Sequence, residues 1–159
     1  MSDFHYQSAL AAAHTHALEW LGSLHTRPLP PRLDETAIAA SLGEIPGEPE
    51  DVSTTIDLLA ERMEPGLTGM GSGRFFGFII GGVHPAALAA DWLVSAWDQN
   101  AAMGAVTPAT AAAERTAGRW LLDLLGLPAG SSGGFASGAT MANFVGFPAA
   151  RGELLGRLG

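Results

Sequence analysis

Hydrophobic residues recur at helical spacing over most of the chain. In residues 4–25, Leu10, Ala13, Ala17 and Leu21 are three or four positions apart, which places them on one face of a helix. Similar patterns, bounded by capping residues, prolines and glycines, predict further helices. These helices cover residues 34–42, 51–63, 85–100 and 107–125, and a last one begins at Met141.

Capping residues mark several of the predicted helix ends. Asp34 is suited to cap the helix that follows it, and Gly43 is suited to end that helix. Either Asp51 or Ser53 is suited to cap the next helix, and Thr107 is predicted to cap the helix that starts at the following proline. The helix boundaries therefore follow from side-chain chemistry as well as from hydrophobic spacing.

Two short apolar segments interrupt the helical pattern and predict β-strands. Residues 75–80 are bounded by glycines and read either as a buried strand or as an aromatic wall beside a ligand. Residues 133–137 form the second candidate strand. Alternating helices and strands are typical of an α/β fold, but a parallel sheet needs more strands than these. We therefore expect the helix-rich opening part of an α/β domain, with an incomplete sheet.

Prolines divide the first part of the chain from the rest. The helices of residues 1–70 are joined by Pro/Gly links, among them residues 28–31, and such a pattern has few ways to bury itself compactly. We expect residues 1–70 to form a helical arm that wraps around another body. Residues 71–159 are expected to begin a larger domain.

The last predicted helix contains Gly146 and Pro148. An interior proline costs a helix about 3 kcal/mol because it removes a hydrogen bond and crowds the preceding turn. We expect a kink there, or an early end near Phe147.

Composition excludes several classes of protein. The chain has 159 residues and a formal net charge of −8, which argues against nucleic acid and anionic membranes as partners. No apolar run is long enough to cross a bilayer, and the first residues do not resemble a secretory signal, so we expect a cytoplasmic protein. There is no cysteine. All eight basic residues are arginine, so the chain has no lysine amine for a Schiff base.

The turn at Ser137-Gly138-Ala139-Thr140 is the strongest candidate binding feature. Unpaired N–H groups and the helix dipole favour an anion at the start of a helix, and small residues let it approach. An ordinary capped helix would explain the same residues, and the two common glycine-rich nucleotide-binding motifs are absent. A serine hydrolase is excluded because Phe135 stands where the GxSxG motif requires glycine.

An ordered series of motifs resembles the pyridoxal-phosphate (PLP)-dependent decarboxylases of the aromatic-amino-acid and glutamate decarboxylase group. The resemblance covers about residues 5–157 in the order found in that family. Its motifs are Arg74-Phe75-Phe76-Gly77-Phe78, Pro85-Ala86-Ala87-Leu88-Ala89-Ala90-Asp91-Trp92, Ser95-Ala96-Trp97-Asp98-Gln99-Asn100, Thr107-Pro108-Ala109, Trp120-Leu121-Leu122-Asp123-Leu124-Leu125-Gly126-Leu127-Pro128 and Ser137-Gly138-Ala139-Thr140-Met141-Ala142-Asn143.

The resemblance implies a fold-type I architecture and a homodimer whose N-terminal helices pack across the two subunits. It also implies that the ring of PLP acts as an electron sink when a small amino-acid substrate loses CO₂. Residues that match the family's sites would divide into two groups. The phosphate-binding group is Gly138, Ala139 and Thr140, with Asn143 behind them, and the substrate group is Phe78, Ile79 and His84.

The chain also departs from the family pattern. The family's ring-stacking histidine, its aspartate and its PLP-binding lysine have no counterpart here, so we expect an N-terminal part that is inactive alone and assign no catalytic residue. Ser72-Gly73 replaces a common His-Pro pair. A non-catalytic remnant that acts as a helical dimerisation module is the alternative, and continuation of the coding sequence past Gly159 would separate the two. The identity of the amino acid stays open.

Overall fold

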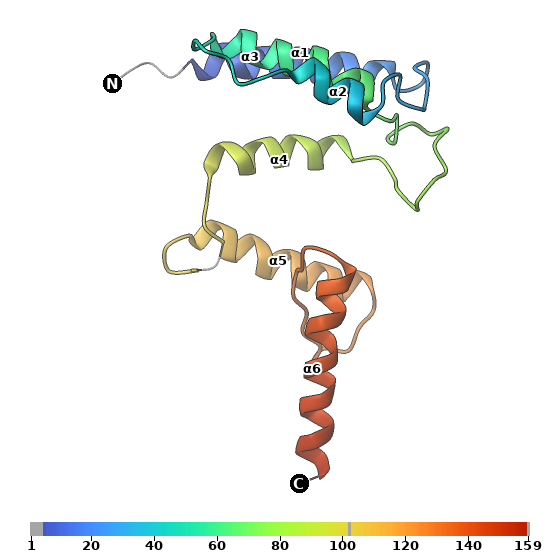
Figure 1. Cartoon of the computed structure of the whole chain (residues 1–159). Coiled ribbons are helices and arrows are strands. Elements are labelled where there is room, and N and C mark those ends of the chain that lie inside the picture. Colours follow the sequence, from blue (N-terminus) through green and yellow to red (C-terminus); the bar gives the residue numbers. More distant parts are fainter. Residues whose placement is uncertain (1–4, 102, 159) are drawn as a thin grey trace. The chain divides into compact units, whose positions relative to one another are not determined.

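The computed structural model describes residues 5–101 and 103–158, which form helices joined by loops (Figure 1). Contacts divide the chain into two units, Met1–Ala89 and Ala90–Gly159, and the boundary falls within α4. The helices are α1 (Tyr6–Ser23), α2 (Glu35–Leu42), α3 (Val52–Met63), the 3-10 helix η1 (Glu64–Gly66), α4 (Pro85–Trp97), α5 (Pro108–Leu124) and α6 (Ala139–Leu158).

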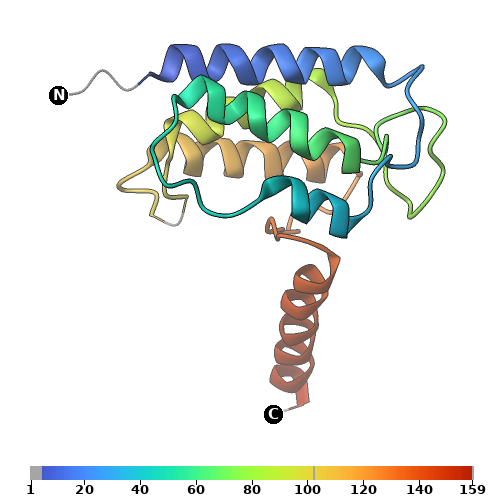
Figure 2. The ribbon, with the colours of Figure 1, turned by 45° about the horizontal axis from the view of Figure 1, so that its top comes forward.

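The N-terminal helices of the first unit pack on one another. α1 lies along α3, and α2 contacts both α3 and η1 (Figure 2). His16 Nε2 is 2.8 Å from Asp57 Oδ1, which links α1 to α3. Gly66 allows the close approach to α2, because a Cβ there would lie 2.8 Å from Ile38 Cγ1. The predicted arm therefore has contacts of its own, which proline spacing alone did not predict.

Side-chain caps confirm two predicted helix starts. Asp34 Oδ1 accepts a hydrogen bond from the Ala37 N–H at 2.9 Å, and α2 ends at Gly43 with a φ of 71°. Of the two candidates for the cap of α3, the structure selects Asp51. Its carboxylate accepts from the backbone N–H of Ser53 at 2.9 Å and from that of Thr54.

The cap of α3 makes its stability depend on pH. Hydrogen bonds from the Ser53 hydroxyl and from the Ser53 and Thr54 N–H groups lower the pKa of Asp51 from its ordinary value of 3.8. A lowered folded-state pKa adds stability above the unfolded-state pKa, and this contribution is lost as the pH falls through the folded value. We expect the Ser53 amide-proton shift to titrate below pH 3.8.

The matched variant for this titration is Asp51→Asn, which keeps a capping side chain but cannot ionise. Its Ser53 amide shift should stay flat over the same pH range. Exposed Glu48 serves as the control through Glu48→Gln, which should titrate like the wild type at Ser53. Equal titration of Ser53 in the wild type and Asp51→Asn would contradict the assignment.

The prediction that the Thr107 side chain caps α5 is wrong, although Thr107 occupies the N-cap position of that helix. Its hydroxyl donates to the carbonyl oxygens of Asn100 and Met103 instead of accepting an N–H from α5. Thr107 is one of the two polar side chains that are buried in the described part of the chain. It therefore closes the loop before α5.

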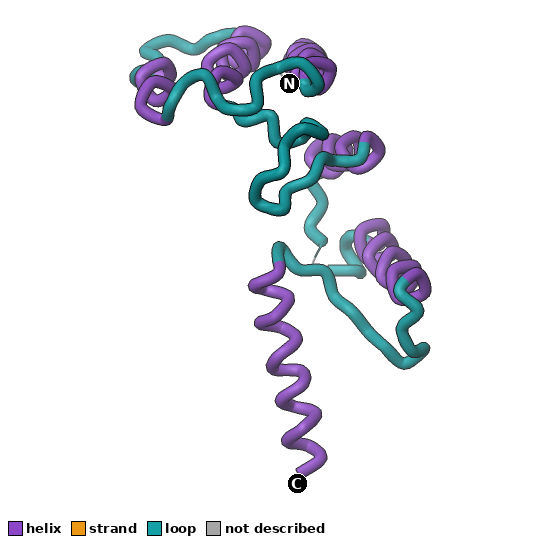
Figure 3. Tube along the Cα trace, turned by 90° about the vertical axis from the view of Figure 1, so that its right-hand side faces the viewer, coloured by secondary structure: helices purple, strands orange, loops and turns teal. Residues whose placement is uncertain are grey.

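The predicted strands are not formed, and residues 5–101 and 103–158 contain no strand (Figure 3). A strand needs the N–H and C=O groups of a neighbour, and neither segment 75–80 nor 133–137 has such a neighbour. Phe78 and Ile79 also have φ values of 57°, which break an extended backbone. The helix-rich character is confirmed, whereas the incomplete sheet is not observed.

α6 does not end early at its proline. It continues through Pro148 to Leu158, so the predicted end near Phe147 is wrong. Proline removes its own N–H donor and crowds the preceding turn, but the residues on both sides keep helical conformation. In the second unit, α5 and α6 make no helix–helix contact in the part of the chain that the structure describes.

Candidate functional site

The first turn of α6 carries the predicted phosphate-binding residues. The helix begins at Ala139, and the Gly138 carbonyl accepts the Ala142 N–H at 3.0 Å, which makes Gly138 the N-cap. Gly138, Ala139, Thr140 and Asn143 are all exposed. The N–H groups of this first turn have no acceptor within the helix, so they and the Thr140 hydroxyl present donors to solvent.

The predicted substrate residues Phe78 and Ile79 lie in the loop between η1 and α4. Phe78 is 85% exposed and Ile79 is fully exposed. Their left-handed φ values of 57° cost about 1–3 kcal/mol each in residues other than glycine. Two large apolar side chains held in strained backbone at a surface are unusual, and such strain is concentrated at functional segments.

Local packing shapes this strained segment. The Phe75 and Phe78 rings lie 6.4 Å apart between centroids, and the Ile80 N–H donates to the Gly77 carbonyl at 3.3 Å. A Cβ on Gly77 would lie 3.0 Å from Phe75 Cζ, so a larger residue there would require the Phe75 ring to shift slightly. The turn thus folds back on the Phe75 ring and leaves Ile79 outside.

His84, the third predicted substrate residue, stands at the start of α4. Its carbonyl accepts the Leu88 N–H at 3.0 Å, and its Nδ1 accepts the Ala86 N–H at 3.2 Å. The hydrogen bond from Ala86 assigns the acceptor role to Nδ1. His84 therefore caps α4, a structural role that the sequence did not predict.

The two groups of predicted residues belong to different units of the chain. Phe78, Ile79 and His84 belong to the first unit, and the four phosphate-binding candidates belong to the second. The residues around 138–143 share one helix end, and residues 78–84 share one loop.

An arginine cluster in the first unit was missed by the sequence analysis. The Arg27 guanidinium lies 3.4 Å from the centroid of the Trp20 ring and pairs with Glu64. The Arg27 side chain is only 14% exposed. Arg74, which the sequence analysis quoted only as part of a motif, donates to the carbonyl oxygens of Leu24 and Arg27. The sequence signal for this contact was the position of Trp20, two helical turns before Arg27.

Ser72 belongs to the Ser72-Gly73 pair that departs from the His-Pro pair common in the family that the chain resembles, and it has a clear structural role. It is 4% exposed, and its hydroxyl oxygen accepts the Arg74 N–H at 3.3 Å. The Phe75 N–H donates to the Ser72 carbonyl at 3.0 Å. Ser72 thereby closes the turn that leads into the strained segment.

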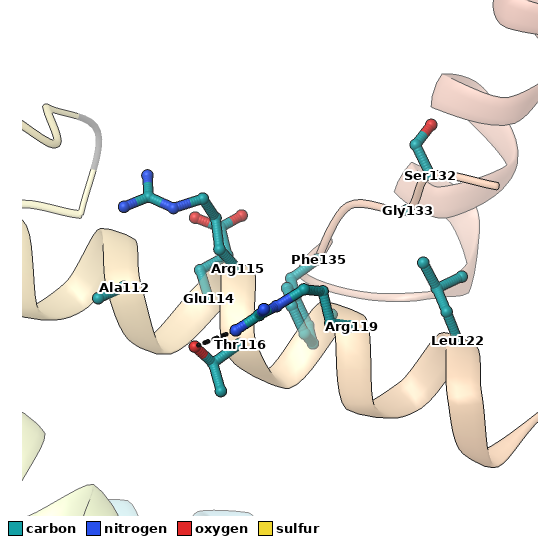
Figure 4. Close-up of a pocket in the computed structure, with 10 residues that line it drawn as sticks. Ala112, Glu114, Arg115, Thr116, Arg119, Leu122, Ser132, Gly133 and Phe135 are labelled. Carbon is teal, nitrogen blue, oxygen red and sulfur yellow. Dashed lines mark hydrogen bonds between the residues drawn. The ribbon is translucent and has the colours of Figure 1, made fainter. Parts of the chain in front are cut away.

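An open cavity of about 820 Å³ lies in the second unit, between α5 and the segment before α6 (Figure 4). Arg115, Arg119 and Phe135 line it, and Arg119 donates to the Thr116 hydroxyl at 3.4 Å. None of the residues 138–143 lines this cavity. It is therefore separate from the predicted phosphate turn.

No group of three histidine, aspartate or glutamate side chains among the described residues is placed to hold a metal ion. Within the same residues, no helix is both long and apolar enough to cross a membrane.

Comparison with known protein families identifies the chain. The family model described as the pyridoxal-dependent decarboxylase conserved domain matches residues 37–158. This range includes the strained loop, His84 and the first turn of α6. Neither the comparison with curated proteins nor that with solved structures found a match. Because the match covers well over half of the sequence, the chain belongs to the pyridoxal-dependent decarboxylase family.

Proposed function

We propose that this chain supplies the helical arm and the phosphate-binding turn of a PLP-dependent amino-acid decarboxylase of fold-type I. Residues 1–70 form the arm, and residues 71–159 begin the α/β cofactor domain. The observation that carries the proposal is the exposed Gly138-Ala139-Thr140 turn at the start of α6, inside the range that matches the decarboxylase domain. Family membership makes PLP the anion that this turn would hold.

The residues present fit the phosphate end of PLP. Gly138 has open space where a Cβ would stand, and the adjacent N–H groups and the Thr140 hydroxyl are donors suited to an anion. The carbonyl end does not fit in the same way, because the chain has no lysine to bond to it. When bound, PLP supplies a ring that accepts the electron pair released as the substrate carboxylate leaves as CO₂.

The arm has a proposed role in assembly. We propose that two copies form a homodimer through their N-terminal helices. α1 supports this proposal, because its side chains Leu10 and Leu18 are 53% and 55% exposed although both are apolar. Large exposed apolar areas mark interaction surfaces.

A non-catalytic interaction module is the second candidate function. The absence of lysine favours it, because a chain without a lysine amine cannot complete the covalent chemistry of PLP enzymes by itself. Binding of a PLP analogue separates the two candidates, since an interaction module has no need to keep the phosphate site.

Thr140→Ala tests the phosphate site. We expect the variant to bind 4′-deoxypyridoxine 5′-phosphate, which lacks the aldehyde, about 10- to 100-fold more weakly than the wild type. A hydrogen bond to a charged group contributes about 1.5–3 kcal/mol, which gives that range. Equilibrium dialysis measures the affinity without requiring a covalent bond.

Thr116→Ala is the matched control for this test. Thr116 is also a threonine in the second unit, but it lies on α5 outside the phosphate turn. Its substitution should leave the affinity for the analogue unchanged. Equal affinities of Thr140→Ala and the wild type, or no binding to the wild type, would count against the proposed function.

A further inference from the structure

The strained loop is tied to the end of α1 by one side chain, that of Arg74. Its Nη2 donates to the carbonyl oxygens of Leu24 at 3.3 Å and Arg27 at 2.6 Å. Leu24 is the C-cap of α1, and Arg27 follows in the same turn region. Carbonyl groups at a helix C-terminus lack intrahelical donors, so the guanidinium supplies the donors they need.

The surface to which Arg74 is attached is itself held from two sides. Arg27 stacks on Trp20 of α1 and pairs with Glu64 of η1. In addition, the Gly69 N–H donates to the Leu29 carbonyl at 2.9 Å. The Arg27 carbonyl therefore belongs to a fixed part of the first unit.

The residues that precede and follow Arg74 in the sequence make contacts within the loop itself. Ser72 closes the turn before it, and the Phe75 and Phe78 rings contact each other after it. In the part of the chain that the structure describes, the Arg74 side chain bonds Leu24 and Arg27, and the Gly69 N–H bonds Leu29 in the segment after α1. Of these two attachments, Arg74 is the one that directly precedes residues 75–80.

We propose that Arg74 is a positioning residue, which holds Phe78 and Ile79 in the orientation that contacts the side chain of the amino-acid substrate. This inference rests on the proposed function, together with the family resemblance that assigns Phe78 and Ile79 to the substrate group. Arg74 does not contact the substrate. It acts by attaching the loop, just before residues 75–80, to the end of α1. The exposed, left-handed backbone at Phe78 and Ile79 then keeps one conformation.

Amide hydrogen exchange of the full chain tests the attachment directly. We expect Arg74→Gln to speed the exchange of the Phe75 and Ile80 amides at least about tenfold, because local opening no longer has to break the contacts of the guanidinium. Arg74→Lys keeps a charged donor and should restore part of the protection. Arg32→Gln, an exposed arginine in the same unit, is the matched control and should exchange like the wild type.

Ligand binding tests the positioning role. L-Phenylalanine presents the apolar amino-acid side chain alone, and 4′-deoxypyridoxine 5′-phosphate presents the phosphate alone. The wild type should bind each of them. Arg74→Gln should weaken binding of L-phenylalanine about tenfold and leave the affinity for deoxypyridoxine phosphate unchanged. Arg74→Lys should recover part of the lost affinity.

The possible results test the attachment of the loop and the substrate role of Arg74 separately. Unchanged exchange in Arg74→Gln overturns the attachment, even if the phosphate analogue binds. Equal loss of affinity for both ligands overturns the positioning role, because it indicates damage to the whole fold. A wild type that binds neither ligand overturns the proposed function and the substrate role of Arg74 with it. A wild type that binds deoxypyridoxine phosphate but not L-phenylalanine overturns the substrate wall alone.

Discussion

The isolated chain is expected to self-associate and to bind the hydrophobic dye ANS strongly. No hydrophobic side chain is buried among the described residues. On α6, Phe144 is 69% exposed and Phe147 is 73% exposed. Among the described residues, no other helix of the second unit packs against α6. Covering one such side chain stabilises an assembly by about 1.5–3 kcal/mol.

Substitution on α6 should reduce the association strongly. We expect Phe144→Ser with Phe147→Ser to weaken self-association by about 100-fold or more, because two aromatic side chains no longer leave water. Sedimentation velocity over a range of concentrations measures the effect, and ANS fluorescence should fall in parallel. Arg151→Gln, on the same exposed helix, is the matched control and should associate like the wild type.

One solution behaviour would contradict the expected self-association. A monomer that melts in one sharp, cooperative transition and binds little ANS would contradict the expected exposure of apolar surface. Such a protein would have to bury side chains that are exposed here, Trp120 and Leu124 of α5 among them.

Borohydride reduction of the chain with PLP is expected to leave no pyridoxyl group on any internal side chain. A reducible imine requires a primary amine, and all eight basic side chains are arginine. The guanidinium group stays protonated at every practical pH and does not form such an imine. A chain with a reactive lysine should therefore carry a pyridoxyl label, and this chain should carry none on its side chains.

Peptide mapping by mass spectrometry measures this result after the α-amino group has been blocked by acetylation. Arg119→Lys serves as the positive control, since it introduces one amine at the open cavity lined by Phe135. The control should become labelled at residue 119 and the wild type should not. An internal pyridoxyl adduct in the wild type would overturn the prediction.

Helix starts were predictable where one short side chain satisfies the local donors. Asp34 and Asp51 cap their helices with carboxylate oxygens that reach N–H groups two or three residues ahead. Thr107 had the same local signal, but its hydroxyl found carbonyl acceptors in the preceding loop. A local pattern cannot predict that outcome, because the position of the loop decides which partner is closer.

The candidate site was predictable in part. The first turn of α6 follows from Gly138 and Thr140, because small and hydroxyl residues at a helix start have a local effect. The left-handed backbone at Phe78 and Ile79 was not predictable, since apolar aromatic and β-branched residues favour extended structure. In the structure these residues instead follow a turn at Gly77 that folds back on the Phe75 ring.

The sequence by itself determined the helices, the lack of a lysine amine and the small-residue turn before α6, because each depends on neighbouring residues or on composition alone. It also carried the motifs that place residues 37–158 in the decarboxylase family. The tertiary structure alone decided that Arg74 donates to the carbonyl oxygens of Leu24 and Arg27 and that Arg27 pairs with Glu64. These contacts join residues 37 to 50 positions apart, and only packing of helices brings such partners within hydrogen-bonding distance.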